Sequence, residues 1–545
     1  MSDLAQPSRA FRPEERPMFP GSPYAPTHAL IRRFGYATVG LLLGATLNLA
    51  NGIVSANVPV LAGARQDYLI STALLPGIYV AFNASANLVL VKGRAQFGIP
   101  KVTLSLLFAT MSAALILFLA PGPLTAIGLS AVSGMTAAGL TTLTVYYFMQ
   151  SFPAPIKPLG LIIGIGTTQL GTPLARLVPV DLLALDGGQS FALLELGIAL
   201  LGFALIYGYP LPPSERSKAF EPLDIVVFAL FLGANILLCS ALAEGRLLWW
   251  SDTPWIGLAL AGCIPLYATA ILIERERANP MLRLSWISTG TMLRFAAVAI
   301  VVRLALAEQS YGSVGLLGIA GLDNDQYHTL FGWILLAEIL GIVVAVVTLR
   351  ADRPPYQVMA AAIVIAFGAW LDTGSSNVTR PDNLFLSQSL IAFGTTLFIG
   401  PALVFGAAQM LRRGPDHLVS FVVLFSMTQN IGGLAGSALL GSYQIIRAKV
   451  HAAILAEGML AGNPLVADRI QQGGHALAGA ITDPAQQTIQ GAGLLGGALG
   501  REAAILGFND AFWLIVIVAL CAAAFIASAI IWIKWRDRQI VPKGA

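Results

Sequence analysis

The segment Val89–Val102, VLVKGRAQFGIPKV, places Lys92, Arg94 and Lys101 between two long apolar runs. Two glycines interrupt the segment, which favours a turn. Short loops that connect membrane-spanning helices carry an excess of lysine and arginine on the cytoplasmic side. We therefore predict that this segment is a tight, basic, cytoplasmic turn between the second and third spans of a membrane protein.

The composition of the whole chain supports this interpretation. Hydrophobic residues make up 56% of the 545 residues, charged residues make up 11%, and the mean hydropathy is +0.75. These values lie outside the range of soluble globular chains, so the protein is expected to be an integral membrane protein. The net charge of +4 is small and its cations are scattered, so nucleic acid is not an expected partner. The three cysteines lie in hydrophobic runs and show no metal-binding spacing.

Hydrophobic windows give the number of spans. A helix of about 20 apolar residues crosses a hydrocarbon core about 30 Å thick. Windows of this length follow one another almost without gaps and predict an all-α integral membrane protein with about 14 transmembrane helices. The weakest window is short and begins after Pro354-Pro355. The predicted spans are 34–58, 69–91, 99–120, 124–148, 158–180, 190–211, 223–243, 253–273, 288–310, 327–349, 355–372, 385–411, 418–446 and 508–534.

The distribution of cations orients these spans. With the N-terminus inside, most of the 32 lysines and arginines fall in cytoplasmic loops and tails, whereas the short outer loops contain only Arg65, Arg246 and Arg380. One missed helix would invert the pattern downstream, so the agreement supports the count. We predict a multi-pass protein of the plasma (inner) membrane with both termini cytoplasmic, as a disordered tail at 1–33 and a second tail at 535–545.

The chain also contains an internal repeat. Spans one to six can be set against spans nine to fourteen, with two spans inserted between them. A basic loop follows the second span of each half, and the fifth span of each half is rich in glycine. Glycine allows helices to rock against one another, although ordinary tight packing is the alternative. The predicted domains are 34–211, 212–287 with the inserted helices, and 288–534, which includes an extracytoplasmic segment at 447–507.

Several features together resemble the fourteen-span drug:proton antiporter branch of the major facilitator superfamily. They are the basic loop after span two, the fifth span with its glycines and proline, the link Asn279–Leu284, and Phe508–Trp513 after the long outer loop. The resemblance covers nearly the whole chain after residue 34 and implies two six-helix bundles with two inserted helices. It further implies a secondary transporter that exports amphipathic small molecules or drugs by proton antiport. Some members of this family work with a periplasmic adaptor and an outer-membrane channel.

Three motifs depart from the family pattern. In the basic loop, Val91 replaces a glycine and Gln96 replaces an arginine. Asn51 stands where the family carries a buried aspartate, and Gly171–Arg176 replaces the end of the family signature in span five. An amide can bind a substrate but cannot release a proton, so these departures bear on proton antiport rather than on the fold. A non-transporting receptor or scaffold derived from a transporter is the alternative function.

Enzymatic activity and a cofactor are not expected. The five histidines lie outside the hydrophobic runs or at their edges, and no Walker-type glycine loop with lysine is present. The expected partners are therefore a small-molecule substrate and the lipid bilayer.

Ionisable residues inside spans are candidate functional groups because their insertion costs several kcal/mol. Arg303 in span nine and Glu338 in span ten lie at similar depths, so they are predicted to pair as a site that couples transport to a proton or binds substrate. A purely structural salt bridge is the alternative. Arg176 and Glu195 are predicted to form a second pair, for which the structural role is favoured. Glu308 lies closer to a span end and is expected to snorkel.

Amides gather in the first two spans. Asn83 and Asn87 are four residues apart and share a helix face, and with Asn51 they are predicted to line a cavity near the membrane centre. Interhelical hydrogen bonding is the alternative.

The basic turn has a predicted role in gating. Its residues Lys92, Arg94, Gly98 and Lys101 are expected to pair with carboxylates or helix C-termini when an inner gate closes. The alternative is that the cations only set the topology.

The segment 447–507 is the only large region predicted outside the membrane. Ile446, Val450 and Ile454 recur at a spacing of four, so span thirteen is expected to continue outward as an amphipathic helix. Glycine and proline are then expected to break the helix repeatedly, including at Gly496-Gly497. We interpret this segment as a docking surface for the adaptor.

Overall fold

The computed structural model describes residue 15, residue 17 and residues 21–184, 189–350, 353–459 and 462–540. Most of the predicted N-terminal tail and the last five residues of the C-terminal tail lie outside these ranges. The described part is helical and contains no strand, apart from one isolated bridge between Pro23 and Ser214. The expected all-α membrane fold is confirmed.

The first half of the chain forms ten α-helices. They are α1 (Leu30–Leu47), α2 (Leu49–Ala56), α3 (Val58–Ala64), α4 (Leu69–Phe97), α5 (Ile99–Leu119), α6 (Pro123–Ser151), α7 (Lys157–Thr167), α8 (Gly171–Arg176), α9 (Asp181–Ala184) and α10 (Gln189–Gly208).

The inserted region and the second half follow. They contain α11 (Pro222–Leu248), α12 (Pro254–Glu276), α13 (Leu284–Ile287), α14 (Gly290–Ala305), the π-helix η4 (Glu308–Gly312), α15 (Ser313–Ile319), the 3-10 helix η5 (Asn324–Tyr327), α16 (His328–Val347), α17 (Pro354–Asp372), α18 (Phe385–Arg413), α19 (Leu418–Glu457), α20 (Pro464–His475) and α21 (Pro484–Ile540).

Thirteen helices in the described part are long and apolar enough to cross a membrane. The predicted fifth span is the one missing from this set, because residues 168–170 divide it into α7 and α8. Pro173 lacks the N–H that would continue the helix to Gln169, and it is accommodated in the first turn of α8. The described part of the chain therefore has thirteen long spans, and a broken helix takes the place of the predicted fifth span.

The contacts between the two halves follow the internal repeat. Span two (α4) packs on span thirteen (α19), while span five (α7) packs on span ten (α16). When spans one to six are exchanged for spans nine to fourteen, each of these contacts becomes the other. Such a relation is expected of two related six-helix halves, and the division into these halves stays a prediction.

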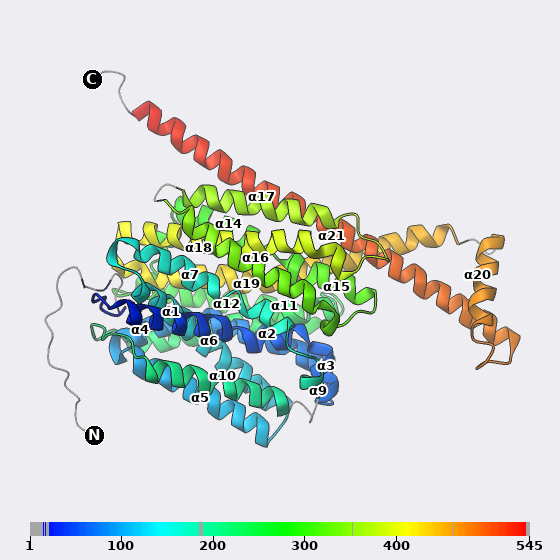
Figure 1. Cartoon of the computed structure of the whole chain (residues 1–545), viewed down its shortest axis with the longest axis horizontal. Coiled ribbons are helices and arrows are strands. Elements are labelled where there is room, and N and C mark those ends of the chain that lie inside the picture. The colour runs from blue at the N-terminus through cyan, green and yellow to red at the C-terminus, as the bar shows by residue number, and fades with distance from the viewer. Residues whose placement is uncertain are drawn as a thin grey trace.

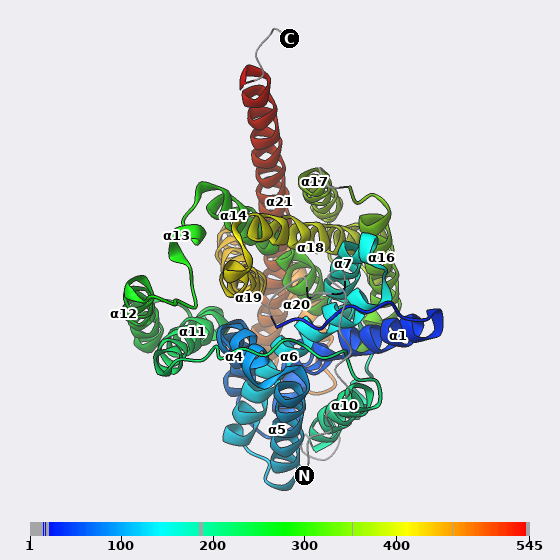
Figure 2. The same ribbon diagram turned by 90° about the vertical axis from the view of Figure 1, so that its left-hand side faces the viewer.

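The inserted helices lie at the side of the bundle. Helix α11 packs against α4 and α19, so it covers one seam between the halves, and α12 packs against α11 (Figure 2). Pro222 and Pro254 each occupy the first turn of their helices, where a missing N–H costs no hydrogen bond.

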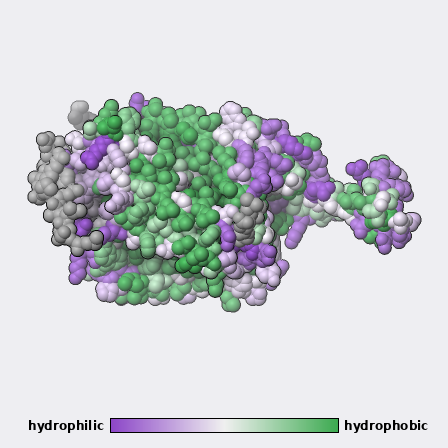
Figure 3. Space-filling model, turned by 60° about the horizontal axis from the view of Figure 1, so that its bottom comes forward, coloured by the Kyte–Doolittle hydropathy of each residue, from purple (hydrophilic) through white to green (hydrophobic). Residues whose placement is uncertain are grey.

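The start of helix α1 and the end of helix α21 lie on the same side of the bundle (Figure 1). This side is called the terminal end. The opposite end carries α3, α9 and α20. A band of hydrophobic side chains lies between more hydrophilic ends, as expected for a bilayer-spanning protein (Figure 3).

A helical projection extends from the opposite end (Figure 1). Helix α19 continues outward to Glu457, as predicted, and α20 packs against the outer part of α21. The predicted break at Gly496-Gly497 is wrong, because α21 runs without interruption from Pro484. Gly474 and Gly491 instead let the two backbones touch: a Cβ on Gly491 would collide with the carbonyl oxygen of Ile470.

Candidate functional site

A cavity of about 680 Å³ lies between the two halves. The first half contributes residues of α2, α3, α4, α6, α7 and α8, and the second half contributes residues of α14, η4, α16, α18 and α19. Apolar side chains form most of its wall, with amides, hydroxyls and a few charged groups among them. This lining suits a ligand that has both apolar and polar parts.

The cavity is closed at the terminal end. There its lining residues Arg94, Met410 and Phe421 are buried, with exposed fractions of 3%, 0% and 2%. Toward the opposite end, the lining residues Ser55 and Pro59 are exposed. Among the described residues, the cavity is thus open toward the opposite end and closed toward the terminal end.

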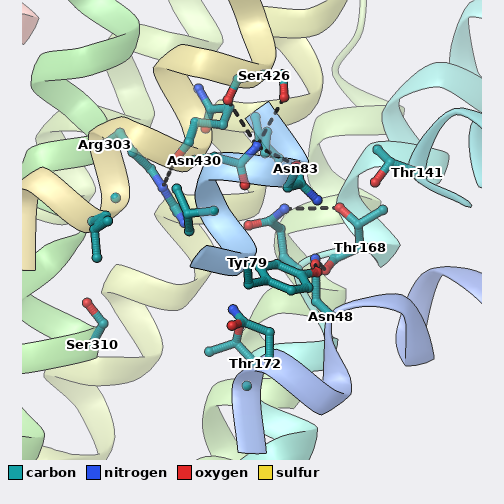
Figure 4. A pocket seen from close by; sticks show the side chains of 18 of the residues that line it. Asn48, Tyr79, Asn83, Thr141, Thr168, Thr172, Arg303, Ser310, Ser426 and Asn430 are labelled. Atoms are coloured by element: carbon teal, nitrogen blue, oxygen red, sulfur yellow. Dashed lines mark hydrogen bonds between the residues drawn. The ribbon is translucent and has the colours of Figure 1, made fainter. Parts of the chain in front are cut away.

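The broken helices of spans one and five meet beside the cavity. Asn48 separates α1 from α2, and its Nδ2 donates a hydrogen bond to the carbonyl oxygen of Thr168, 2.9 Å away, in the break between α7 and α8. The Tyr79 hydroxyl donates to Asn48 Oδ1 over 3.0 Å (Figure 4). These bonds satisfy a carbonyl that the helix break leaves free inside the membrane.

A hydrogen bond crosses from one half to the other in the cavity wall. Asn430 Nδ2 on α19 donates to Asn83 Oδ1 on α4 over 3.0 Å, and it also approaches the Ser426 carbonyl oxygen at 3.0 Å (Figure 4). Asn51 and Asn87 line the same cavity, and Asn87 Oδ1 is buried without a hydrogen-bond partner. The three predicted amides are therefore cavity-lining residues, and Asn83 also fits the interhelical alternative.

Arg303 and Glu338 line the same cavity from α14 and α16. They are close enough to interact electrostatically but form no direct ion pair, since Arg303 Nε donates to the Gln429 carbonyl oxygen over 3.0 Å. Glu338 is 3% exposed, and its Oε2 has no hydrogen-bond partner. The wall thus offers a cation and a carboxylate oxygen to a ligand between them.

The predicted pair of Arg176 and Glu195 does not form. Arg176 lines the cavity and its Nη1 donates to the Ala56 carbonyl oxygen and to Asn324 Oδ1, over 3.2 and 3.3 Å. Glu195 accepts a hydrogen bond from Ser133 and is not a lining residue. Asn324 belongs to η5, so Arg176 contacts this segment rather than span six.

The basic segment is mostly helical, contrary to the predicted loop. Helix α4 continues to Phe97, and the turn is Gly98 alone, whose φ of +87° suits glycine. Lys92 Nζ binds Asp224 Oδ2 at 2.8 Å, so this cation does pair with a carboxylate. Arg94 lines the closed, terminal end of the cavity, whereas Lys101 is exposed.

The departure at Gln96 has a structural use. Its Oε1 accepts hydrogen bonds from the backbone N–H groups of Ala219 and Phe220, over 3.1 and 2.9 Å. The amide oxygen thus binds the linker that leads into α11. An arginine side chain could not make this contact, because it has no acceptor atom.

Sequence reasoning missed Tyr79, Gln429 and Asn430. Both side-chain polar atoms of Gln429 are buried without partners, and the residue lines the cavity. The spacing of Ser426 and Asn430, four residues apart on one helix face, was the available signal.

Sequence comparison matches the chain to no family model and to no curated protein. Comparison of structures finds the crystal structure of the human organic anion transporter MFSD10 (TETRAN). It covers 90% of this chain and 100% of that chain, with a TM-score of 0.52 and 12% sequence identity. A bacterial homolog of the human lysosomal transporter Spinster, in an inward-facing and unoccupied conformation, covers 92% and 97%, with 13% identity and a TM-score of 0.48.

The protein is therefore a multi-pass membrane protein with a major-facilitator-type fold. The likeness to MFSD10 shows the fold alone, and it does not distinguish the fourteen-span drug:proton antiporter branch from other branches.

Proposed function

We propose that the protein is a secondary active transporter of amphipathic small molecules. The observation that carries this proposal is the cavity between the two related halves, closed at one end and open toward the other. Binding of substrate from one side, followed by rocking of the halves, would expose the same cavity to the second side. The fold that the chain shares with MFSD10, an organic anion transporter by its description, supports the proposal.

The cavity lining supports an amphipathic substrate. Arg303 and Glu338 offer one charge of each sign, and Gln429 and Asn87 carry buried polar atoms without partners. A buried polar group costs free energy unless it is hydrogen-bonded, so a ligand that bonds these atoms gains affinity. We further propose export coupled to protons, with Glu338 as the group that binds the proton or the substrate.

Transport in sealed vesicles tests this function. The purified full-length protein, reconstituted with an imposed pH gradient, should move some members of a panel of amphipathic cations and anions faster than protein-free vesicles do. Thr141→Trp, which places a bulky ring in the cavity, should lose this flux. The matched variant Phe108→Trp, at a 66% exposed position on α5, should keep it. Equal flux in all samples would favour the receptor or scaffold.

The helical projection is proposed to lie outside the cytoplasm and to dock a periplasmic adaptor that leads to an outer-membrane channel. Its exposed apolar side chains include Ile454, Leu465 and Ile489. A cysteine at the exposed Gln472 should react with a membrane-impermeant reagent added outside, and a photocrosslinker there should capture an adaptor. Labelling from the cytoplasmic side only would refute the proposed orientation. Full export after deletion of residues 462–500 would refute the docking role.

A further inference from the structure

A buried acidic pair lies in the second half, outside the cavity. Glu308 on η4, Asp372 at the end of α17 and Gln388 near the start of α18 have exposed fractions of 0%, 2% and 0%. None of the three lines the cavity. The expectation that Glu308 would snorkel is wrong, because the π-helical turn directs its side chain toward α17 and α18 rather than toward an interface.

A single amide holds both carboxyl groups. Gln388 Nε2 donates to Glu308 Oε1 over 2.9 Å and to Asp372 Oδ2 over 2.7 Å. Gln388 Oε1 accepts a hydrogen bond from Ser313 Oγ over 3.1 Å, which fixes the orientation of the amide. Both hydrogens of the amide group are thereby used.

The two carboxyl groups lie close together, because one amide nitrogen bonds to both of them. Two carboxylates are both acceptors, so they can bond to each other only when one of them carries a proton. Glu308 Oε2 is buried and has no hydrogen-bond partner among the described groups, so it offers a site for that proton. Two buried carboxylates that share one amide donor repel each other, which favours a proton on one of them, as in the paired aspartates of acid proteases.

The charged groups on the packed elements have other partners. On α11, Arg246 donates to the Tyr311 hydroxyl over 3.1 Å. On α19, Arg447 and His451 bind Asp510 of α21 at 2.6 and 2.7 Å. In the described ranges, no lysine, arginine or histidine forms an ion pair with Glu308 or Asp372. The pair therefore has no cationic partner other than a proton.

We propose that Glu308 and Asp372 form a proton-binding site that shares one exchangeable proton and communicates with the cavity through η4. The residues next to Glu308, Gln309 and Ser310, line the cavity. Release of the proton to water leaves two adjacent carboxylates, whose repulsion displaces the π-helical turn and the wall that it carries. As a coupling site, the pair rests on the proposed transport function.

Infrared spectroscopy of the full-length protein in lipid nanodiscs tests the proton directly. The wild type should show the carbonyl band of a protonated carboxylic acid at neutral pH. Glu308→Gln should remove the contribution of this pair, because the amide N–H replaces the shared proton and leaves Asp372 ionised. Asp372→Asn is the second variant and should shift the band of Glu308. An unchanged band in both folded variants would overturn the proposal.

Labelling of Ser310→Cys, with Cys521 replaced by serine, tests the link to the cavity. The labelling rate should change with pH in this background and lose that change when Glu308→Gln is added. The same pH dependence in both proteins would overturn the link. Neither measurement uses transport, so a wild type that keeps the infrared band but moves no substrate would refute the transport function and leave the proton site intact.

Discussion

Arg277→Ala should lower the free energy of unfolding by about 3–5 kcal/mol, because it leaves buried carboxylates without their cation. Arg277 follows α12, and its guanidinium binds Asp224 at 2.6 Å, Glu274 at 2.7 Å and Glu221 at 2.8 Å. The Asp224 and Glu274 side chains are fully buried, whereas Glu221 is 41% exposed and contributes less because water screens its charge. Lys92 remains as the only cation in this network.

Thermal and denaturant unfolding of the purified protein would measure this loss. Arg275→Ala removes an exposed cation two residues earlier and is the matched control, which should change stability by no more than about 0.5 kcal/mol. Equal unfolding curves for the two variants would show that the network does not hold α12 to α11. Arg277→Lys should lie between them, since an ammonium does not reproduce the three-way contact of a guanidinium.

The pH dependence of this difference has a defined sign. Hydrogen bonds from Arg277 and Asn279 hold the pKa of Glu221 below its usual value. Burial alone would lower the pKa of Arg277, but hydrogen bonds to the three carboxylates raise it, so the arginine stays charged. A carboxyl group whose pKa is lower in the folded than in the unfolded protein stabilises the fold. This contribution is complete at pH values above the unfolded pKa of about 4.3, and it is lost as the pH falls through the folded pKa. The difference in free energy of unfolding between the wild type and Arg277→Ala should therefore become smaller as the pH falls below about 4.3.

The sequence predicts the spans well because bilayer thickness sets their length directly. It does not predict where a span bends. The fifth span has enough apolar residues to cross, but Pro173 removes one hydrogen bond and the chain divides into α7 and α8. The same glycine content that suggested breaks in α21 instead serves close packing there, at Gly491. Whether a glycine breaks a helix or packs against a neighbour depends on tertiary contacts, which one sequence does not supply.

The sequence predicts only part of the candidate site, because the remaining part also depends on tertiary contacts. The positions of Arg303 and Glu338 along their spans predict similar depths in the bilayer, and both residues line the cavity. Asp372 was missed because it ends its span, where a carboxylate usually reaches water. A π-helical turn, which the hydrophobic pattern does not reveal, brings Glu308 to it.

Glu338→Gln should abolish accumulation driven by a pH gradient, down to the level of protein-free vesicles, while substrate binding and downhill exchange continue. The variant keeps the shape of a residue held on α16, where the Glu338 carbonyl oxygen accepts a hydrogen bond from Thr396 over 2.9 Å. A glutamine can bond a ligand but cannot take up or release a proton. Asn51, at the place where the resembling family carries its acid, cannot do so either.

Glu195→Gln is the matched control for this result. It neutralises an equally buried carboxyl in the first half, which lies outside the cavity and can still accept the hydrogen bond of Ser133. This variant should keep gradient-driven accumulation. Substrate accumulation measured in the same vesicles, with exchange of labelled substrate as the second readout, separates coupling from binding. If Glu338→Gln inserts normally and still concentrates substrate against its gradient, Glu338 does not carry the coupled proton, and the Glu308–Asp372 pair becomes the stronger candidate for coupling.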